Sequence, residues 1–202
     1  MTGGPRARCV LGVDPGDLAD LRAADHLLTE LAAGLALPEA GYAATHLVRT
    51  GRPRIALSFA LPDEDAARAA WHRLTSHREG AAAGAALGSL RHGPAELAGS
   101  AAHAAGEHAF RRAGRAVRYP GSRALTGTLT VAALLAGCAV DRVAVLGAPS
   151  PAADPSQRVR TRGHVRPQWQ EGRLVLAAMP AAGGVLVPFE EPEPTPCCAD
   201  HG

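Results

Sequence analysis

The residues best suited to chemistry lie at the C-terminal end of the chain, which reads EEPEPTPCCADHG over residues 190–202. Cys197, Cys198 and His201 carry soft and borderline donor atoms of the kind that bind zinc, copper(I) or nickel. Adjacent cysteines suit metal capture or thiol exchange better than a structural zinc site, whose paired cysteines are usually roughly two to four residues apart. The pattern predicts a metal-binding or thiol-exchange site here, with an inert terminus as the alternative.

A second candidate site is a set of arginines that would bind an anion. In the segment SQRVRTRGHVR the arginines recur at even spacing, which places their guanidinium groups on one side of an extended strand. Guanidinium groups bind phosphate or carboxylate through paired N–H donors. A turn, YPGSR, adds further arginine at the start of an expected helix. The residues of this predicted anion site are Arg118, Arg123, Arg158, Arg160 and Arg162. The alternative is an edge strand protected from aggregation by its charge.

Two histidines are candidates for acid–base catalysis. His46 falls within an expected strand and His164 opens another, so either side chain can point into a cleft. Histidine is the side chain most often used as a general acid or base at neutral pH. The alternative is that each is an ordinary buried or exposed histidine. A cleft that joins one of them to the predicted anion-binding arginines would favour catalysis.

The composition excludes several classes of protein. All 21 basic residues are arginine, so a Walker-type phosphate loop and a Schiff-base enzyme, which both need lysine, are ruled out within this chain. The G-x-S-x-G motif of serine hydrolases does not occur. Aromatic residues make up only 3% of the chain and no dense basic block is present, so we expect no nucleic-acid partner.

The hydropathy pattern predicts neither a leader peptide nor a membrane partner. The first apolar run is short and is interrupted by Asp14. The longest uncharged segment, residues 124–140, falls short of a spanning helix and is interpreted as a buried core helix. We therefore expect a cytoplasmic protein, in which the four cysteines are thiols rather than disulfides.

The segment VLGVDPG, residues 10–16, resembles the opening strand of Holliday-junction resolvases of the RuvC type, in which the aspartate binds catalytic magnesium. The resemblance implies that Asp14 is a metal ligand. In that family a second strand of a hairpin follows, whereas DLADLRAADHLL has the cap and the leucine spacing of a helix. The interpretation that the sequence favours is a turn at Asp14-Pro15-Gly16 that leads into this helix.

The remaining patterns predict an α+β fold with a mixed or antiparallel sheet and helices packed on it. The first half has the order strand, helix, strand, strand, helix, which is ferredoxin-like. Its central feature is a hairpin over residues 42–61, in which Ile55, Leu57 and Phe59 alternate with smaller residues. Further expected elements are a helix from Pro94 to Arg112, a helix over 123–136, and a strand at DRVAVLGA that is buried on both faces.

We expect residues 1–189 to form one globular domain, with an internal boundary near residues 80–94 left open, and residues 190–202 to form a disordered acidic tail. Three functions remain. The first is an accessory protein that holds a soft metal or exchanges thiols through the tail. The second is an enzyme for a small anionic substrate, with arginines as anchors and a histidine as acid–base. The third is a regulatory or structural subunit that forms a homo-oligomer.

Overall fold

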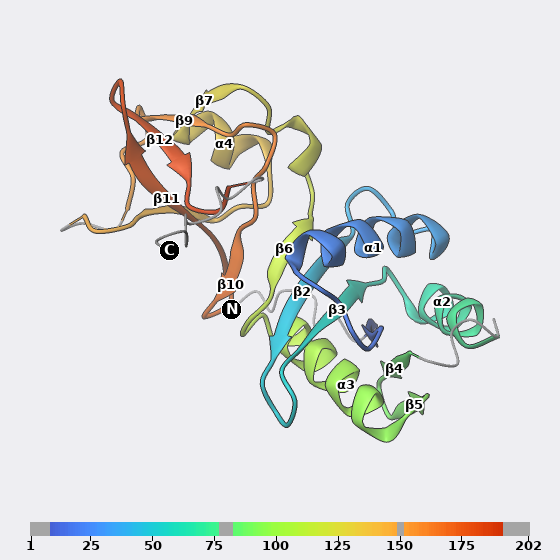
Figure 1. Cartoon of the computed structure of the whole chain (residues 1–202). Helices are drawn as coiled ribbons and strands as arrows, with labels where there is room; N and C mark the ends of the chain where they lie inside the picture. The colour runs from blue at the N-terminus through green and yellow to red at the C-terminus, as the bar shows by residue number, and fades with distance from the viewer. Residues whose placement is uncertain (1–8, 77–82, 149–151, 192–202) are drawn as a thin grey trace, which may run out of the picture.

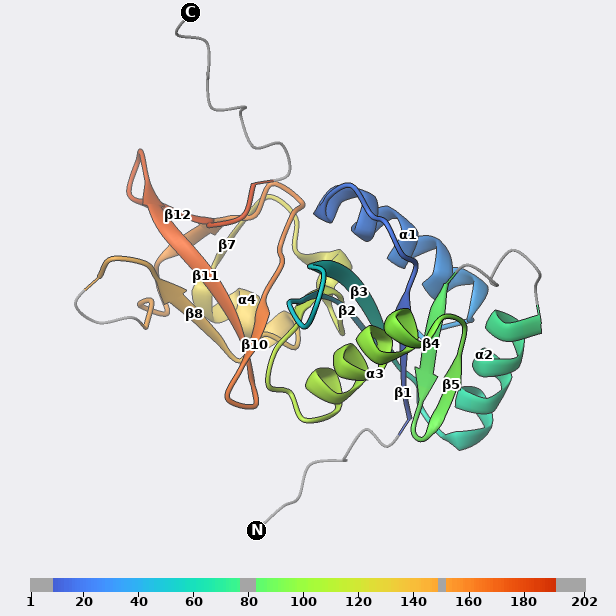
Figure 2. The ribbon, with the colours of Figure 1, turned by 60° about the horizontal axis from the view of Figure 1, so that its bottom comes forward.

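The computed structural model describes residues 9–76, 83–148 and 152–191 and shows an α+β fold with one mixed sheet. Twelve strands are described, in the order β5-β4-β1-β3-β2-β6-β10-β11-β12-β9-β7, and β8 pairs with β11 beside this path. Two of the pairs, β8 with β11 and β9 with β12, are parallel. The elements form two lobes that lie side by side in both views (Figures 1 and 2). The α+β class and the mixed sheet are thus confirmed.

The N-terminal lobe contains three helices around the first part of the sheet. Its elements are β1 (Val10–Asp14), α1 (Leu21–Gly34), β2 (Tyr42–Val48), β3 (Arg54–Ala60), α2 (Glu64–Ser76), β4 (Gly84–Leu87), β5 (Leu90–His92) and α3 (Ala95–Ala109). The predicted hairpin is therefore present as β2 and β3, with Thr45 opposite Leu57. The ferredoxin-like designation remains a prediction, since the sheet continues well beyond these strands.

Helices α1 and α2 cover one face of this part of the sheet. Leu28 of α1 and Ala70 of α2 pack with Leu11, Leu57 and Phe59 of β1 and β3 in one buried cluster. Helix α1 begins at Leu21 because the Asp20 side chain accepts a hydrogen bond from the Ala23 amide. The residues after Asp14 are thus helical only from Leu21 onward, and Asp14 itself is fully buried at the end of β1.

Helix α3 packs on the opposite face, and it lies very close to the strands (Figure 2). A Cβ atom on Gly12 of β1 would lie 1.9 Å from the carbonyl oxygen of Ala101 in α3. A Cβ atom on Gly84 of β4 would lie 2.2 Å from the carbonyl carbon of Leu97. Glycine is required at both positions because helix and sheet backbones approach each other there.

The C-terminal lobe is built mainly from strands. Its elements are β7 (Thr128–Thr130), α4 (Val131–Gly137), β8 (Arg142–Val145), β9 (Arg158–Arg160), β10 (Gln168–Gln170), β11 (Arg173–Ala181) and β12 (Val185–Pro188). A second buried cluster fills it, with Val143, Val159, Leu174, Leu176 and Leu186 at its centre. This cluster is distinct from that of the N-terminal lobe.

Strand β6 (Arg115–Arg118) joins the two lobes. Its Val117 side chain packs in the N-terminal cluster, while Ala116 packs in the C-terminal one. It pairs along its length with β2 and meets β10 where Arg115 lies opposite Gln168, with backbone hydrogen bonds from Ala116 to Pro167 and from Trp169 to Gly114 on either side. The sheet is therefore continuous but narrow at this junction, and Arg115 lies on it.

The structure corrects two local predictions and describes a segment that the sequence left open. Residues 84–92, in the segment where a domain boundary was left open, form the hairpin of β4 and β5, because Ala85 and Ala86 are buried against the neighbouring strand. The helix predicted over 123–136 is only Val131–Gly137, because Thr130 caps it through a hydrogen bond from the Ala133 amide. Strand β8 alternates between half-buried and buried residues rather than being buried on both faces.

Candidate functional site

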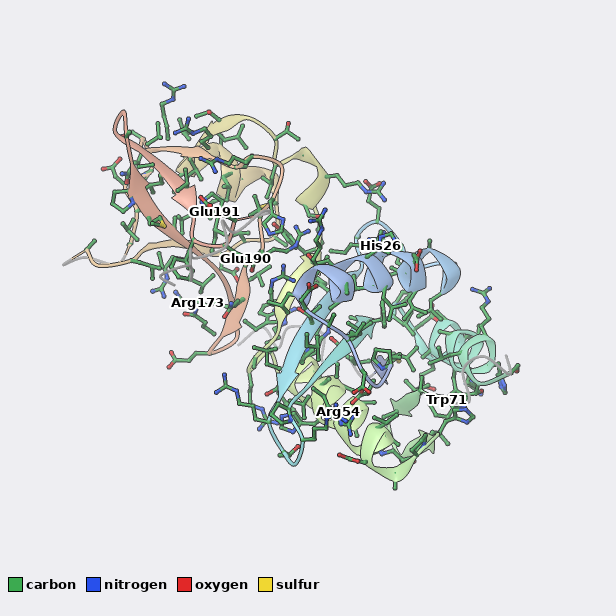
Figure 3. All side chains as sticks on the ribbon, in the orientation of Figure 1. His26, Arg54, Trp71, Arg173, Glu190 and Glu191 are labelled. Atoms are coloured by element: carbon green, nitrogen blue, oxygen red, sulfur yellow. The ribbon has the colours of Figure 1, made fainter. Side chains whose placement is uncertain are left out.

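Two adjoining cavities lie between the lobes, and together we call them the interlobe cleft. The smaller has a volume of about 270 Å³ and includes His46, Glu107 and Arg49 in its lining. The larger has a volume of about 1270 Å³ and includes Asp25, His164 and Arg166. Both are lined by Leu21, Arg115 and Glu190, which places these residues at their boundary. Figure 3 labels His26 on α1 and Glu190 and Glu191 in the C-terminal lobe, the two sides from which the larger cavity is lined.

The floor of the cleft carries five charged or titratable side chains that we call the ion cluster: Asp25, Arg115, His164, Arg166 and Glu190. The Arg115 guanidinium group, 8% exposed, lies between two carboxylates. It donates from Nη1 and Nη2 to Asp25, at 2.5 and 3.0 Å. It donates from Nε to Glu190 Oε2 at 2.6 Å and from Nη2 to Glu190 Oε1.

Each carboxylate of the ion cluster has a second partner. Arg166 Nε donates to Asp25 Oδ2 at 2.9 Å, and His164 Nε2 lies 3.0 Å from Glu190 Oε1. Asp25 comes from α1, whereas His164, Arg166 and Glu190 come from the C-terminal lobe. The ion cluster therefore bridges the two lobes through Arg115.

The protonation states follow from these contacts. Burial alone would raise the pKa of Asp25 and of Glu190, but the hydrogen bonds and charges of Arg115, together with those of Arg166 on Asp25 and of His164 on Glu190, outweigh it and lower both. Burial alone would lower the pKa of Arg115, but its hydrogen bonds to Glu190 and Asp25 raise it instead. Both carboxylates and the guanidinium group are thus fully charged at neutral pH.

A second polar group, which we call the histidine–serine network, lies beneath the smaller cavity. Glu107 Oε2 is 2.8 Å from His46 Nδ1, and His46 Nε2 is 2.8 Å from Ser58 Oγ. Ser58 Oγ is in turn 2.7 Å from His108 Nδ1. The side chain of Glu107 is 23% exposed, whereas that of His46 is fully enclosed. Only the Glu107 end of this network can meet a ligand.

The charge of Glu107 follows from its contact with this network. The hydrogen bond from His46 lowers the pKa of Glu107, so Glu107 is a carboxylate that accepts from His46 Nδ1. Ser58 Oγ lies within hydrogen-bond distance of His46 Nε2, His108 Nδ1 and the Ala44 carbonyl oxygen, at 2.8, 2.7 and 3.5 Å. The Ser58 hydroxyl group thus links the two buried histidines.

The neutral state of His108 predicts how stability depends on pH. Burial, and to a smaller extent the charges of His46 and Arg111, lower the pKa of His108 from 6.5 to about 3. A histidine whose folded pKa is depressed stabilises the fold above its unfolded pKa, and this contribution is lost as the pH falls from about 6.5 toward 3. Linkage gives a loss on the order of 2 kcal/mol between pH 7 and pH 5. Chemical denaturation at several pH values measures it.

The variant His108→Gln should lose much less stability than the wild type over the same pH range. His72→Gln, on the exposed surface of α2, is the matched control and should keep the wild-type dependence. The pKa values of Asp25, Glu107 and Glu190 are lowered from their ordinary values of 3.8 and 4.5. Protonation of these carboxylates therefore changes the stability below pH 5, outside the range in which His108 is tested. An unchanged dependence in His108→Gln would contradict the assignment.

The structure brings the two predicted histidines to the same cleft. His46 borders the smaller cavity and His164, 15% exposed, borders the larger one. Their neighbours there are Arg115, which was not predicted, and Arg166, the last arginine of the segment SQRVRTRGHVR.

The five predicted anion-binding arginines are not gathered in one place. Arg158 and Arg160 are exposed on β9, on either side of buried Val159. Arg162 pairs with Glu191 at 3.3 Å, and Arg123 lies 3.9 Å from Glu39. Arg118, on β6, donates to the Leu37 carbonyl at 3.4 Å.

The predicted metal ligands Cys197, Cys198 and His201 lie outside the described residues, so the metal or thiol-exchange site stays a prediction. Within residues 9–76, 83–148 and 152–191, no three His, Cys, Asp or Glu side chains are arranged to hold a metal ion. In the same residues, every helix is too short or too polar to cross a lipid bilayer. Burial raises the pKa of the Cys9 and Cys138 thiols, which makes both poor nucleophiles.

Comparison with protein-family models, with curated proteins and with solved structures gives no significant match for this chain.

Proposed function

We propose that the chain is an enzyme that acts on a small anionic substrate in the interlobe cleft. The observation that carries this proposal is that a histidine and buried or half-buried guanidinium groups line one cavity, with a carboxylate bound between them. His164 and Arg115 both contact Glu190, at 3.0 and 2.6 Å. A substrate anion in this cleft would thus meet an anchoring charge and a proton-transferring group together.

The anchoring groups are arginines from both lobes. Arg115 supplies a buried guanidinium group and Arg166 a half-buried one at the floor, and Arg22 and Arg49 add exposed ones to the lining of the two cavities. Guanidinium groups in a partly desolvated cleft attract anions more strongly than the same groups in water. This supports a substrate that carries a carboxylate or a phosphate.

The proton-transferring group in this proposal is His164, because its ring lies within the larger cavity and is partly exposed. His46 lies behind Glu107 and is enclosed, so it acts as a positioning residue for that carboxylate rather than on the substrate itself. Glu107 faces the smaller cavity and is suited to accept a hydrogen bond from the substrate.

The experiment is a binding screen of small carboxylates and phosphates by ligand-observed NMR, followed by isothermal titration. Replacing His164 with glutamine should weaken the best ligand roughly tenfold, because one hydrogen bond to a charged group is lost. His72→Gln, on α2, should bind like the wild type. Absence of any binder in the screen, or equal affinity in the two variants, would overturn the proposal.

We also propose that β1 to β4 with α1 and α2 form a ferredoxin-like unit. The order β4-β1-β3-β2, antiparallel throughout, supports it, as does the packing of both helices in one cluster. In this unit α1 carries Asp25 and β2 carries His46 to the edge that faces the C-terminal lobe.

A further inference from the structure

We infer that Glu190 occupies a carboxylate-binding site, and that the carboxylate of a small ligand binds Arg115 and His164 in its place. The inference rests on the proposed function in one respect, since it assigns this position to the anionic group of the substrate. It adds that this anionic group is a carboxylate, and that Glu190 competes with the ligand for the same position.

Glu190 is held as a carboxylate ligand is held. Its two oxygens accept from Nε and Nη2 of one guanidinium edge, and one of them also lies 3.0 Å from His164 Nε2. A guanidinium edge forms this paired arrangement with carboxylate and with phosphate. The group bound to it in this structure is the carboxylate of Glu190, so we assign the site to a carboxylate.

The guanidinium edge stays in position without Glu190. Asp25 accepts from Nη1 and Nη2 of Arg115, and Thr45 Oγ1 lies 3.3 Å from Nη1. If Glu190 withdraws, the remaining charges are Arg115 and Arg166 against Asp25, which leaves one net positive charge at the floor of the cleft. The site is thus preorganised for an anion.

Apart from the Glu190 carboxylate itself, few contacts hold the segment that carries it. In the described part of the chain, residues 189–191 are held by one backbone hydrogen bond, from Phe189 to the Ala177 carbonyl, by the Glu190 carboxylate, and by the Glu191–Arg162 pair. The Phe189 side chain is 59% exposed. The Glu191–Arg162 pair is also exposed and contributes little.

The space around Glu190 suits a small molecule. The larger cavity, of about 1270 Å³, opens beside the Glu190 carboxylate and is lined by polar groups such as Asp20, Arg22 and His26. A ligand whose carboxylate takes the place of Glu190 would extend into this cavity. It would also lie beside His164.

The test is chemical rescue with acetate, measured by thermal unfolding of the full chain. Glu190→Ala empties the site, so its melting temperature should fall and then rise by roughly 2 to 4 °C in acetate, relative to sodium chloride of equal ionic strength. Glu191→Ala, at the neighbouring position, is the matched control. It and the wild type should show no difference between acetate and chloride.

The outcomes separate this inference from the proposed function. A Glu190→Ala variant that responds equally to acetate and chloride overturns the carboxylate site, whatever the wild type binds. A response to phosphate larger than that to acetate overturns the carboxylate assignment. Acetate rescue, combined with a binding screen in which the wild type binds neither a carboxylate nor a phosphate, supports the site and counts against the enzyme.

A second variant covers the case in which Glu190→Ala does not fold. Glu190→Gln keeps the shape of the side chain, but its neutral amide is a weaker occupant than the carboxylate. Acetate should therefore stabilise Glu190→Gln more than the wild type. Equal responses of the two proteins would contradict the inference.

Discussion

Replacement of Arg115 with methionine is expected to lower the free energy of unfolding by about 3 to 5 kcal/mol, the usual cost of removing one partner from a buried ion pair. The Arg115 side chain is 8% exposed and separates two carboxylates that are 16% and 29% exposed. Without the guanidinium group, Asp25 keeps only Arg166 as a charged partner, and Glu190 keeps only His164. Urea denaturation at pH 7 measures the loss.

Two further variants make this prediction specific to the ion cluster. Arg68→Met removes an exposed arginine on α2 that pairs with Glu64 and Asp65, and it should cost less than about 1 kcal/mol. The double variant Arg115→Met with Asp25→Asn should be less destabilised than Arg115→Met alone, because the stranded carboxylate is also removed. A loss for Arg115→Met as small as that of Arg68→Met would show that Arg115 has no such role.

The substitution Gly12→Ala is expected to have the second largest effect, a loss of about 3 kcal/mol at the upper end of overpacking costs. The added methyl group would lie 1.9 Å from the Ala101 carbonyl oxygen and 2.7 Å from the Ala101 carbonyl carbon. These are backbone atoms, so no side chain can rotate out of the way, and α3 itself has to shift. Thermal unfolding compared with the wild type measures this effect.

The matched control is Gly99→Ala, in α3 itself. A Cβ atom there meets nothing within 4 Å, and Gly99 is exposed. Because alanine is the better helix former, this variant should gain up to roughly 1 kcal/mol. Opposite signs for the two substitutions are the expected signature of a close helix–sheet contact. A neutral Gly12→Ala variant would mean that α3 has room to move.

Local patterns predicted the elements whose side-chain spacing is regular. The hairpin of β2 and β3 follows from the alternation of Leu57 and Phe59 with smaller residues, and the Asp20 cap lies in the segment that was expected to be helical. The hairpin of β4 and β5 was missed because short alanine- and glycine-rich segments carry no period. Its strands are fixed by contacts with β1 and α3, which are tertiary.

Most of the ion cluster could not be predicted from the sequence, for a different reason. Arg115 and Asp25 are 90 residues apart, and Arg166 and Asp25 are 141 residues apart. Neither spacing forms a sequence motif, so nothing in the sequence distinguished Arg115 from other arginines in short strands. His46 and His164 were predicted because one falls within an expected strand and the other opens one, although their hydrogen-bond partners are not the predicted arginines. The indication in the sequence that Arg115 is buried is its position next to the apolar residues of β6.

The narrow junction at β6 has a consequence for the cooperativity of unfolding. Each lobe has its own buried cluster, and β6 meets β10 at one pair of residues. The ion cluster adds charged contacts between the lobes, beside the packing of Tyr42 and Arg111 on Trp169. Calorimetric and van't Hoff enthalpies should therefore agree near neutral pH and diverge in acid, as protonation of Asp25 and Glu190 allows each lobe to melt as a separate unit.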